Sequence, residues 1–257
     1  MKISIIGAGN MGGAIARALF VSLYSQASDI TCTARSQQSL ERFQQGFNLT
    51  TDNHAAVVGA DLVIFAVKPW MMEEVVKDVA PYMDLDRQII ASVAAGISLE
   101  QLSQWLGGTP SVFQIIPNTA IEVGSGVTFI ASSNASEQQI DLIVDMFSGM
   151  GYALYVQEEM MAAGTALASC GIAYAMKYIQ ASAQGGVELG FTPEQACRIV
   201  EHTVKGAAEL LLSTGNPPQK EIDKVTTPGG ITMKGLAAME QAGFTSAVIS
   251  GLENSKK

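Results

Sequence analysis

The chain carries, close to its amino terminus, the stretch Ile3-Ser4-Ile5-Ile6-Gly7-Ala8-Gly9-Asn10-Met11-Gly12. A short apolar run, typical of a buried strand, leads directly into glycines with the spacing Gly-x-Gly-x-x-Gly. This spacing predicts a tight turn at Gly7, a close approach of the backbone to a pyrophosphate at Gly9, and close helix–strand packing at Gly12. The following helix would direct its backbone N–H groups at the phosphates. We interpret the stretch as a dinucleotide-binding loop; the alternative is an ordinary glycine-rich turn.

Beyond this loop, short β-rich runs alternate with amphipathic segments as far as about Val156. The expected strands are Lys2–Ile6, Ile30–Ala34, Leu62–Ala66, Gln88–Ser92, Ser111–Ile116, Gly126–Ile130 and Tyr152–Val156. The expected helices include Met11–Ser22, Gln37–Gln45, Met71–Ala80, Leu99–Leu106 and Glu137–Ser148. Such alternation is typical of a parallel, doubly wound sheet. We therefore predict an α/β fold in which residues 1–156 form a Rossmann-type dinucleotide-binding domain.

After Val156 the strand pattern stops, and residues 157–257 are predicted to form an all-helical domain. The expected helices are Glu159–Gly190, Pro193–Thr214, Pro218–Val225 and Gly230–Ala242. Within the first of them, Met160–Met176 is almost free of charge, which raises the alternative of a membrane span. Its length, its small polar residues and the following Lys177 favour a helix buried between protein surfaces. One small domain cannot easily bury a helix that is apolar nearly all round, so the sequence predicts dimerisation through this half.

Composition excludes several classes of partner. The net charge is −9 and the isoelectric point about 4.7, without clusters of Lys and Arg, so nucleic acid is not an expected partner. Three cysteines without regular spacing predict neither a disulfide framework nor a metal site. The first residues lack the pattern of a secretory signal, which favours a cytoplasmic location. An anionic substrate would need a local trap in so acidic a protein.

The end of the second expected strand bears on the choice of cofactor. Where an NAD enzyme would carry an acidic residue for the ribose hydroxyls, this chain has Thr33-Ala34-Arg35-Ser36. A cation and a hydroxyl suit a 2′-phosphate, so NADPH is the expected cofactor, with NADH possible. The alternative for Arg35 is a solvated surface charge.

The third of the strands listed above ends in Ala66-Val67-Lys68-Pro69, at the carboxyl edge of the sheet where ligands bind in open α/β folds. Lys68 is either a catalytic base or a flank of the nucleotide site. Because Pro69 fixes the turn and no acid stands near Lys68 in the sequence, we favour a positioning role.

With these residues assembled, the chain resembles the pyrroline-5-carboxylate reductases, the NAD(P)H enzymes that make L-proline. The resemblance covers essentially the whole chain and rests on Ile5–Gly12, Ala66–Pro69, Ser92-Val93-Ala94-Ala95-Gly96-Ile97, Ile116-Pro117-Asn118-Thr119 and, above all, Val225-Thr226-Thr227-Pro228-Gly229-Gly230-Ile231-Thr232. It implies a Rossmann domain followed by a helical dimerisation domain, with active sites formed between the subunits of a homodimer and with larger rings of dimers in some members.

The resemblance also implies roles for particular residues. The cofactor would contact Gly7, Ala8, Gly9, Asn10, Met11, Gly12, Arg35, Ser36, Asn53, Ala66, Val67, Lys68, Pro69, Ala94, Ala95 and Gly96. The small imino-acid substrate would contact Glu158, Thr227, Gly229, Gly230, Ile231 and Thr232. Backbone N–H groups of Gly230 to Thr232 would bind its carboxylate, while the Thr232 hydroxyl, the expected catalytic group, would bond the ring nitrogen.

The expected chemistry is the reduction of L-1-pyrroline-5-carboxylate to L-proline. A protonated cyclic imine is already an electrophile, so holding it in the correct geometry replaces a strong general acid. One departure concerns Ala168-Ser169-Cys170-Gly171-Ile172-Ala173-Tyr174, where Cys170 replaces a hydroxyl residue and Ile172 a proline of the usual family pattern. It leaves two alternatives open: a reductase of another cyclic imino acid or hydroxy acid, with Lys177 or Lys205 as the catalytic lysine of the latter, or a nucleotide-binding regulatory paralogue.

Overall fold

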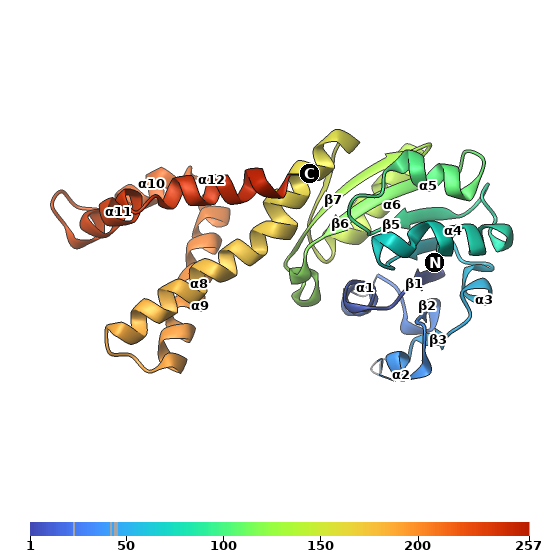
Figure 1. Ribbon diagram of the computed structural model, residues 1–257, viewed down its shortest axis with the longest axis horizontal. Coiled ribbons are helices and arrows are strands. Elements are labelled where there is room, and N and C mark those ends of the chain that lie inside the picture. The colour runs from blue at the N-terminus through green and yellow to red at the C-terminus, as the bar shows by residue number, and fades with distance from the viewer. Residues whose placement is uncertain (23, 42, 44–45, 257) are drawn as a thin grey trace. The chain divides into compact units, whose positions relative to one another are not determined.

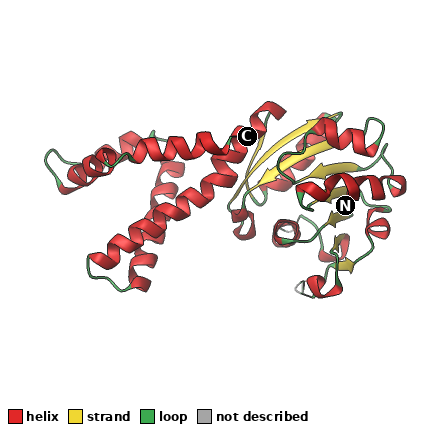
Figure 2. Ribbon diagram, in the orientation of Figure 1, coloured by secondary structure: helices red, strands yellow, loops and turns green. Residues whose placement is uncertain are grey.

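The computed structural model describes residues 1–22, 24–41, 43 and 46–256. The chain forms two compact units, Met1–Ser169 and Cys170–Ser255, whose elements are labelled in Figure 1. The described part of the first unit is a sheet covered by helices, and that of the second contains helices without strands (Figure 2). The expected fold class, a Rossmann-type sheet followed by a helical domain, is confirmed.

The sheet of the first unit has the strand order β3-β2-β1-β4-β5-β6-β7-β8. The strands are β1 (Ile3–Ile6), β2 (Ile30–Thr33), β3 (Asn48–Thr50), β4 (Leu62–Phe65), β5 (Ile89–Ser92), β6 (Val112–Pro117), β7 (Gly126–Ser133) and β8 (Gly151–Tyr155). All pairs from β3 to β6 are parallel. Chain order runs outward from β1 in one direction to β3 and in the other from β4 to β6, so the point of reversal lies between β1 and β4. Ligands bind at such a switch point, beyond the carboxyl ends of the strands.

The expectation of a wholly parallel sheet is wrong at β7, which pairs antiparallel with β6. The physical reason is the short connection between them, residues 118–125, because a parallel return needs a crossover of a dozen or more residues. The chain then returns through α6, and β8 pairs parallel with β7. The sequence reading also omitted β3 and the short α3, each too brief to show a periodic pattern.

Helices cover both faces of the sheet. Their bounds are α1 (Asn10–Val21), α2 (Gln37–Leu40), α3 (Asn53–Val57), α4 (Met72–Val79), α5 (Leu99–Leu106) and α6 (Glu137–Ser148). Alternate residues of β4 divide between the two layers: Leu62 and Ile64 pack with α1 and α6, and Val63 and Phe65 with α3, α4 and α5. Helix α2 ends at Leu40, short of the expected end at Gln45; residues 42, 44 and 45 of that prediction lie outside the described residues.

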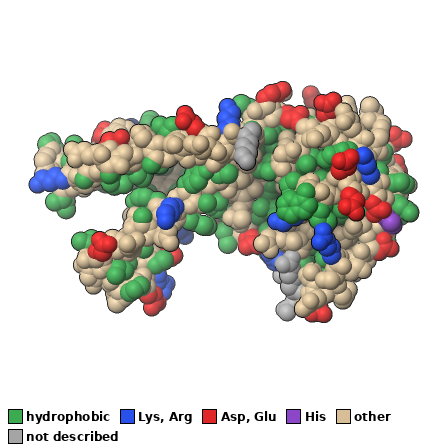
Figure 3. Space-filling model, in the orientation of Figure 1, with side chains coloured by type: hydrophobic (Ala, Val, Ile, Leu, Met, Phe, Trp, Pro, Cys, Tyr) green, Lys and Arg blue, Asp and Glu red, His purple; other side chains and the backbone are tan. Residues whose placement is uncertain are grey.

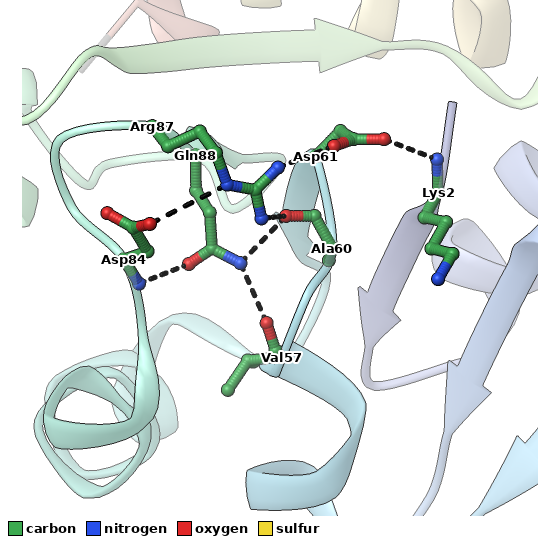
Figure 4. A network of polar contacts seen from close by, with 7 residues as sticks. All are labelled: Lys2, Val57, Ala60, Asp61, Asp84, Arg87 and Gln88. Carbon is green, nitrogen blue, oxygen red and sulfur yellow. Dashed lines mark hydrogen bonds and ion pairs between the residues drawn. The ribbon is translucent and has the colours of Figure 1, made fainter.

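A polar network links elements near the amino ends of β1, β4 and β5 (Figure 4). The Asp61 carboxylate accepts hydrogen bonds from the Lys2 backbone amide at 2.8 Å and from Arg87 at 2.7 Å. The Lys2 amide, followed by the Arg87 guanidinium, lowers the pKa of Asp61. Buried Gln88 donates from its side-chain amide to the Val57 carbonyl at 2.7 Å. These bonds fix the register of the strands at the edge opposite the carboxyl ends.

The expected single helix Glu159–Gly190 is interrupted. The structure has a 3-10 turn (Glu158–Met160), helix α7 (Met161–Gly164), a π-helical turn (Thr165–Cys170) and helix α8 (Gly171–Glu188). Helix α7 belongs with the sheet, because a Cβ atom on Gly164 would lie 2.7 Å from the ring of Phe129 on β7. The boundary between the compact units follows Ser169, shortly before α8, whereas the sequence places the expected domain boundary earlier, after residue 156.

The second unit consists of α8 with α9 (Pro193–Thr214), α10 (Pro218–Lys224), α11 (Ile231–Gln241) and α12 (Phe244–Ser255). Helices α8 and α9 pack closely, since a Cβ atom on Gly186 would lie 3.0 Å from Cβ of Ala196. Helix α12, which the sequence reading did not include, contacts α8: the Tyr174 hydroxyl donates to the Gly251 carbonyl at 3.2 Å. Within the described residues, no helix combines the length and apolar character that a membrane crossing requires.

Candidate active site

The glycine loop joins the carboxyl end of β1 to α1. Gly7 has φ +94°, and a Cβ atom on it would lie 2.6 Å from Cγ1 of Val67, so a side chain is excluded there both by conformation and by space. Thr33, at the end of β2, holds the loop: its hydroxyl accepts from the Gly7 amide at 3.1 Å and its carbonyl from the Ala8 amide at 2.6 Å. The loop is therefore held by contacts with residues at the ends of β2 and β4.

Two further glycines of the loop differ in the space around them. A Cβ atom on Gly12 would lie 2.5 Å from the Gly7 carbonyl oxygen and 3.0 Å from Cβ of Ala66, which explains why α1 can approach the sheet so closely. A Cβ atom on Gly9, the residue before α1, would meet nothing nearer than 3.9 Å, so space is left above the helix terminus. No side chain caps α1 and its first turn holds no acidic residue. These features fit the pyrophosphate of a dinucleotide.

A cavity of about 1130 Å³ opens over this loop. Its lining includes most of the residues expected to bind the cofactor: Gly7, Ala8, Gly9, Asn10, Met11, Arg35, Asn53, Ala66, Val67, Lys68, Pro69, Ala94 and Ala95. Three expected residues are outside the lining. Gly12 lies beneath the loop, Ser36 caps α2 by accepting from the Ser39 amide, and Gly96 lies beyond the end of β5 with φ +82°.

The charged groups of the lining suit a polyanion. Arg35 and Lys68 are exposed, and neither forms an ion pair with a described residue. The carboxylate of Glu122, which also lines the cavity, is paired with Arg17 on α1 at 2.6 Å. Two cations thus remain available to phosphate groups, while the acidic side chain is neutralised.

The lining also contains residues that the sequence reading did not assign. Trp70 and Met71 directly follow Pro69 in the 3-10 turn η2 (Pro69–Met71), and Thr119 begins the 3-10 turn η4 (Thr119–Val123) after β6. Their position beside recognised motifs was the available signal. Nothing in their residue types alone distinguishes a cavity wall from an ordinary loop.

The second expected site precedes α11. Gly229 has φ +73°, and the Gly230 amide donates to the Thr227 carbonyl at 2.8 Å. A Cβ atom on Gly230 would lie 2.5 Å from the Thr227 hydroxyl oxygen, so the tight turn requires glycine. No side chain caps α11 and its first turn holds no acidic residue, which leaves the first amides of the helix available to a carboxylate. Ile231 and Thr232 are both exposed.

Glu158 has a different environment from these residues. Its carboxylate accepts a hydrogen bond from the Leu99 amide at 2.7 Å, and it therefore caps α5 within the first unit. Cys170 is the last residue of the π-helical turn, so the departure from the family pattern coincides with the interruption of the helix. Lys177 and Lys205 bond to Gln180 and Glu209 of their own helices and lie outside the cavity lining.

Comparison with known proteins decides the family. Residues 158–257 match the family model described as pyrroline-5-carboxylate reductase dimerisation, and residues 2–96 match the model for NADP oxidoreductase, coenzyme F420-dependent. The chain is 36% identical to pyrroline-5-carboxylate reductase 1 of Dictyostelium discoideum, over 98% of this chain and 48% of that protein. It is 34% identical to pyrroline-5-carboxylate reductase of Aquifex aeolicus, over 97% of this chain and 92% of that protein. The chain belongs to the pyrroline-5-carboxylate reductase family.

Solved structures of the family agree with the fold. The pyrroline carboxylate reductase of Plasmodium falciparum, determined with NADP bound, superposes with a TM-score of 0.91 at 26% identity, covering 99% of this chain and 95% of that one. The pyrroline-5-carboxylate reductase of Coxiella burnetii gives a TM-score of 0.91 at 28% identity with the same coverage. The likeness to the reductases therefore extends through both compact units.

Proposed function

We propose that this protein reduces L-1-pyrroline-5-carboxylate to L-proline with NADPH. The observation that carries the proposal is that one chain of the reductase family has both a glycine-loop cavity with two unpaired cations and an uncapped helix terminus at Gly230. Relatives similar over nearly the whole chain are named for this activity, and one similar structure contains NADP. This chain spans 48% of the length of the Dictyostelium relative and 92% of the length of the Aquifex relative.

In the proposed cofactor site, the amides at the start of α1 hold the pyrophosphate, and Arg35 with Ser36 holds the 2′-phosphate. Asn53 and Ala66–Pro69 flank the adenosine half, and Ala94–Gly96 the nicotinamide half. The bound cofactor supplies a hydride to the carbon of the imine. Lys68 has a positioning role, since it lines the cavity, where its ammonium group can approach phosphates, and it forms no ion pair with a described carboxylate.

In the proposed substrate site, the amides of Ile231 and Thr232 hold the carboxylate, and the turn at Thr227 and Gly229 shapes the approach. The Gly230 amide, also expected to bind the carboxylate, instead donates to the Thr227 carbonyl and closes this turn. The Thr232 hydroxyl accepts a hydrogen bond from the protonated ring nitrogen and so orients the imine carbon. Glu158 is the proposed acid on the substrate side. Its carboxylate caps α5 by accepting a hydrogen bond from the Leu99 amide. No strong acid is needed, because the substrate arrives already protonated.

We further propose that the protein works as a homodimer through residues 157–257, with residues 1–156 as the dinucleotide domain. The family model for residues 158–257 is described by dimerisation, and the helical unit exposes many large apolar side chains. Whether dimers associate further is measured by the same light-scattering experiment that tests the dimer. A cytoplasmic location remains our expectation for a reductase of this class.

The test is an NADPH-oxidation assay with pyrroline-5-carboxylate, run beside other cyclic imines and hydroxy acids. Thr232→Ala removes one hydrogen bond near a charged centre, worth about 1.5–3 kcal/mol, so kcat/KM should fall by about ten- to a hundredfold. Thr232→Ser keeps the hydroxyl and serves as the control. The dissociation constant for NADPH should stay unchanged in both. An unaffected Thr232→Ala variant, or turnover of a hydroxy acid in place of the imine, would contradict the proposal.

A further inference from the structure

Trp70 stands out on the wall of the cofactor cavity. The residue lies in the turn η2, lines the cavity, and is 79% exposed. Its indole makes no hydrogen bond or ring contact with another described residue. An indole ring carries a large apolar surface whose burial would be favourable. A flat aromatic ring that is this exposed on a cavity wall is suited to contact a ligand.

The turn that carries Trp70 is held in place. Pro69 fixes the backbone at its start, and the Met71 amide donates to the Lys68 carbonyl at 2.9 Å. Met72, at the beginning of α4, is fully buried in the core below. The indole is therefore presented from a short turn anchored on both sides.

The strand order shows which end of the cavity this turn faces. Ala94, Ala95 and Thr119 follow β5 and β6, on one side of the glycine loop, whereas Arg35 follows β2 on the other. Arg35 reaches across to the turn itself, with its Nη2 atom 2.7 Å from Sδ of Met71. Trp70 is thus next to a residue in contact with Arg35, at the end of the cavity where β2 terminates. In this fold class the end of β2 receives the ribose of the adenosine half.

We propose that Trp70 stacks on the adenine ring of the bound dinucleotide and, with Arg35, forms the site that recognises adenosine 2′-phosphate. The inference rests on the dinucleotide site of the proposed function and adds a residue for the purine. The two side chains recognise different parts of the cofactor. Stacking recognises the π-face of the base, which NADPH and NADH share, whereas the guanidinium recognises the phosphate that only NADPH has.

A stacked base matters in this protein because long-range attraction cannot help. With a net charge of −9, the chain as a whole repels an anionic nucleotide, so binding depends on local contacts. Removal of an aromatic partner from a stacked base weakens binding by roughly 5- to 150-fold. Trp70→Ala should therefore weaken NADPH and NADH by the same factor, whereas Arg35→Ala should weaken NADPH alone.

The decisive experiment is calorimetric titration with the two halves of the cofactor, so that no turnover is needed. Adenosine 2′,5′-bisphosphate probes the adenosine end, and nicotinamide mononucleotide probes the other. Trp70→Ala should weaken the bisphosphate by roughly 5- to 150-fold and leave the mononucleotide unchanged. Trp70→Phe keeps an aromatic face and should recover most of the affinity, whereas Trp70→Leu, which keeps apolar bulk without the face, should not.

Fluorescence provides an independent measurement, because the chain has two tryptophans, Trp70 and Trp105. Trp105 lies on α5, is half-buried against the core and is outside the cavity lining, so Trp105→Phe leaves Trp70 as the sole reporter. Adenosine 2′,5′-bisphosphate should quench the emission of that variant. It should leave the emission of Trp70→Phe, where Trp105 is the reporter, nearly unchanged.

The outcomes separate this inference from the proposed function. If Trp70→Ala binds the bisphosphate as the wild type does, or loses affinity for the mononucleotide instead, stacking on adenine is wrong while the dinucleotide site stands. If Trp70→Leu binds as well as Trp70→Phe, the contribution is apolar bulk and the stacking is again wrong. If the wild type binds neither NADPH nor the bisphosphate, the proposed function itself fails.

Discussion

The two compact units of this chain bury their apolar side chains very differently. In the sheet unit, every residue of β1, β4, β5 and β6 is buried, and two core clusters lie on opposite faces. Among the described residues of Cys170–Ser255, only Ala196 and Glu221 are buried. Figure 3 shows apolar side chains at the surface of helices in this second unit. The most exposed of the large ones include Leu189, Leu212 and Ile231, each more than 80% exposed.

This difference indicates what stabilises each unit. A sheet with helices on both faces encloses its own core, so the first unit has the burial that a single domain needs. The second unit has regular helices with good start signals but little shared interior. Exposed large apolar side chains in such number are characteristic of a protein interface. Its stability should therefore depend on a second copy, whereas that of the sheet unit should not.

The strongest test of this comparison is an aspartate placed on an exposed apolar position in each unit. Ala175 on α8 and Val58 after α3 are both exposed in the single chain. Ala175→Asp would place an unpaired charge in the proposed dimer interface and should cost more than about 3 kcal/mol, so that light scattering finds a monomer or unfolded chain without activity. Val58→Asp should keep the wild-type mass, expected at twice 27.1 kDa. A stable, active Ala175→Asp dimer would contradict the role we give to α8.

A second test compares two helical glycines. A Cβ atom on Gly12 would clash with the backbone carbonyl of Gly7, whereas one on Gly235 in α11 would meet no heavy atom within 4 Å. Gly12→Ala should lower the free energy of unfolding by about 1–3 kcal/mol and weaken NADPH binding. Gly235→Ala should raise it by about 0.5–1 kcal/mol, because the unfolded chain loses freedom. Urea titration measures both; a destabilised Gly235→Ala would show that another surface approaches α11 there.

The smallest expected effect concerns Glu221, the only charged side chain buried among the described residues. Its Oε1 atom accepts from Asn216 at 2.6 Å and from Lys224 at 2.7 Å, and these partners, Lys224 first, lower the pKa of the carboxyl from 4.5. The unfolded chain therefore binds the proton more tightly, so the stabilisation is complete above pH 4.5 and is lost as the pH falls through the folded value. Glu221→Gln should be less stable than wild type at pH 7 by thermal melting, with the difference disappearing in acid. A difference that grows on acidification would contradict this assignment.

Much of the fold could be predicted where the signal is local. Helices α5, α6 and α9 have the bounds expected from the sequence, since each begins at a capping box: Ser98 with Gln101, Ser136 with Gln139, and Thr192 with Gln195. The glycine loop was also recognisable, because its function requires glycine at fixed intervals. Strand direction was not local: β7 runs antiparallel because its connection to β6 is short.

The candidate site also contains residues that the sequence predicted and residues that only the structure revealed. Most of the expected cofactor residues line one cavity, because they follow strands that end at the same edge of a parallel sheet. Trp70 was missed, since its exposure on the cavity wall and the contact of neighbouring Met71 with Arg35 arise only when two distant loops meet. The bond from the Leu99 amide to Glu158 joins residues far apart in sequence, so no spacing rule could reveal it.

The sequence alone predicted the order of most strands and helices, the glycine loop at Gly7–Gly12 and the turn that precedes α11, because each depends on the conformational limits of neighbouring residues. Only the tertiary structure decided the antiparallel β7, the break between α7 and α8 and the cavity wall at Trp70. These features depend on close contacts between segments remote in the chain, such as Gly164 against Phe129. Such contacts are set by packing in three dimensions, which no local pattern of residues encodes.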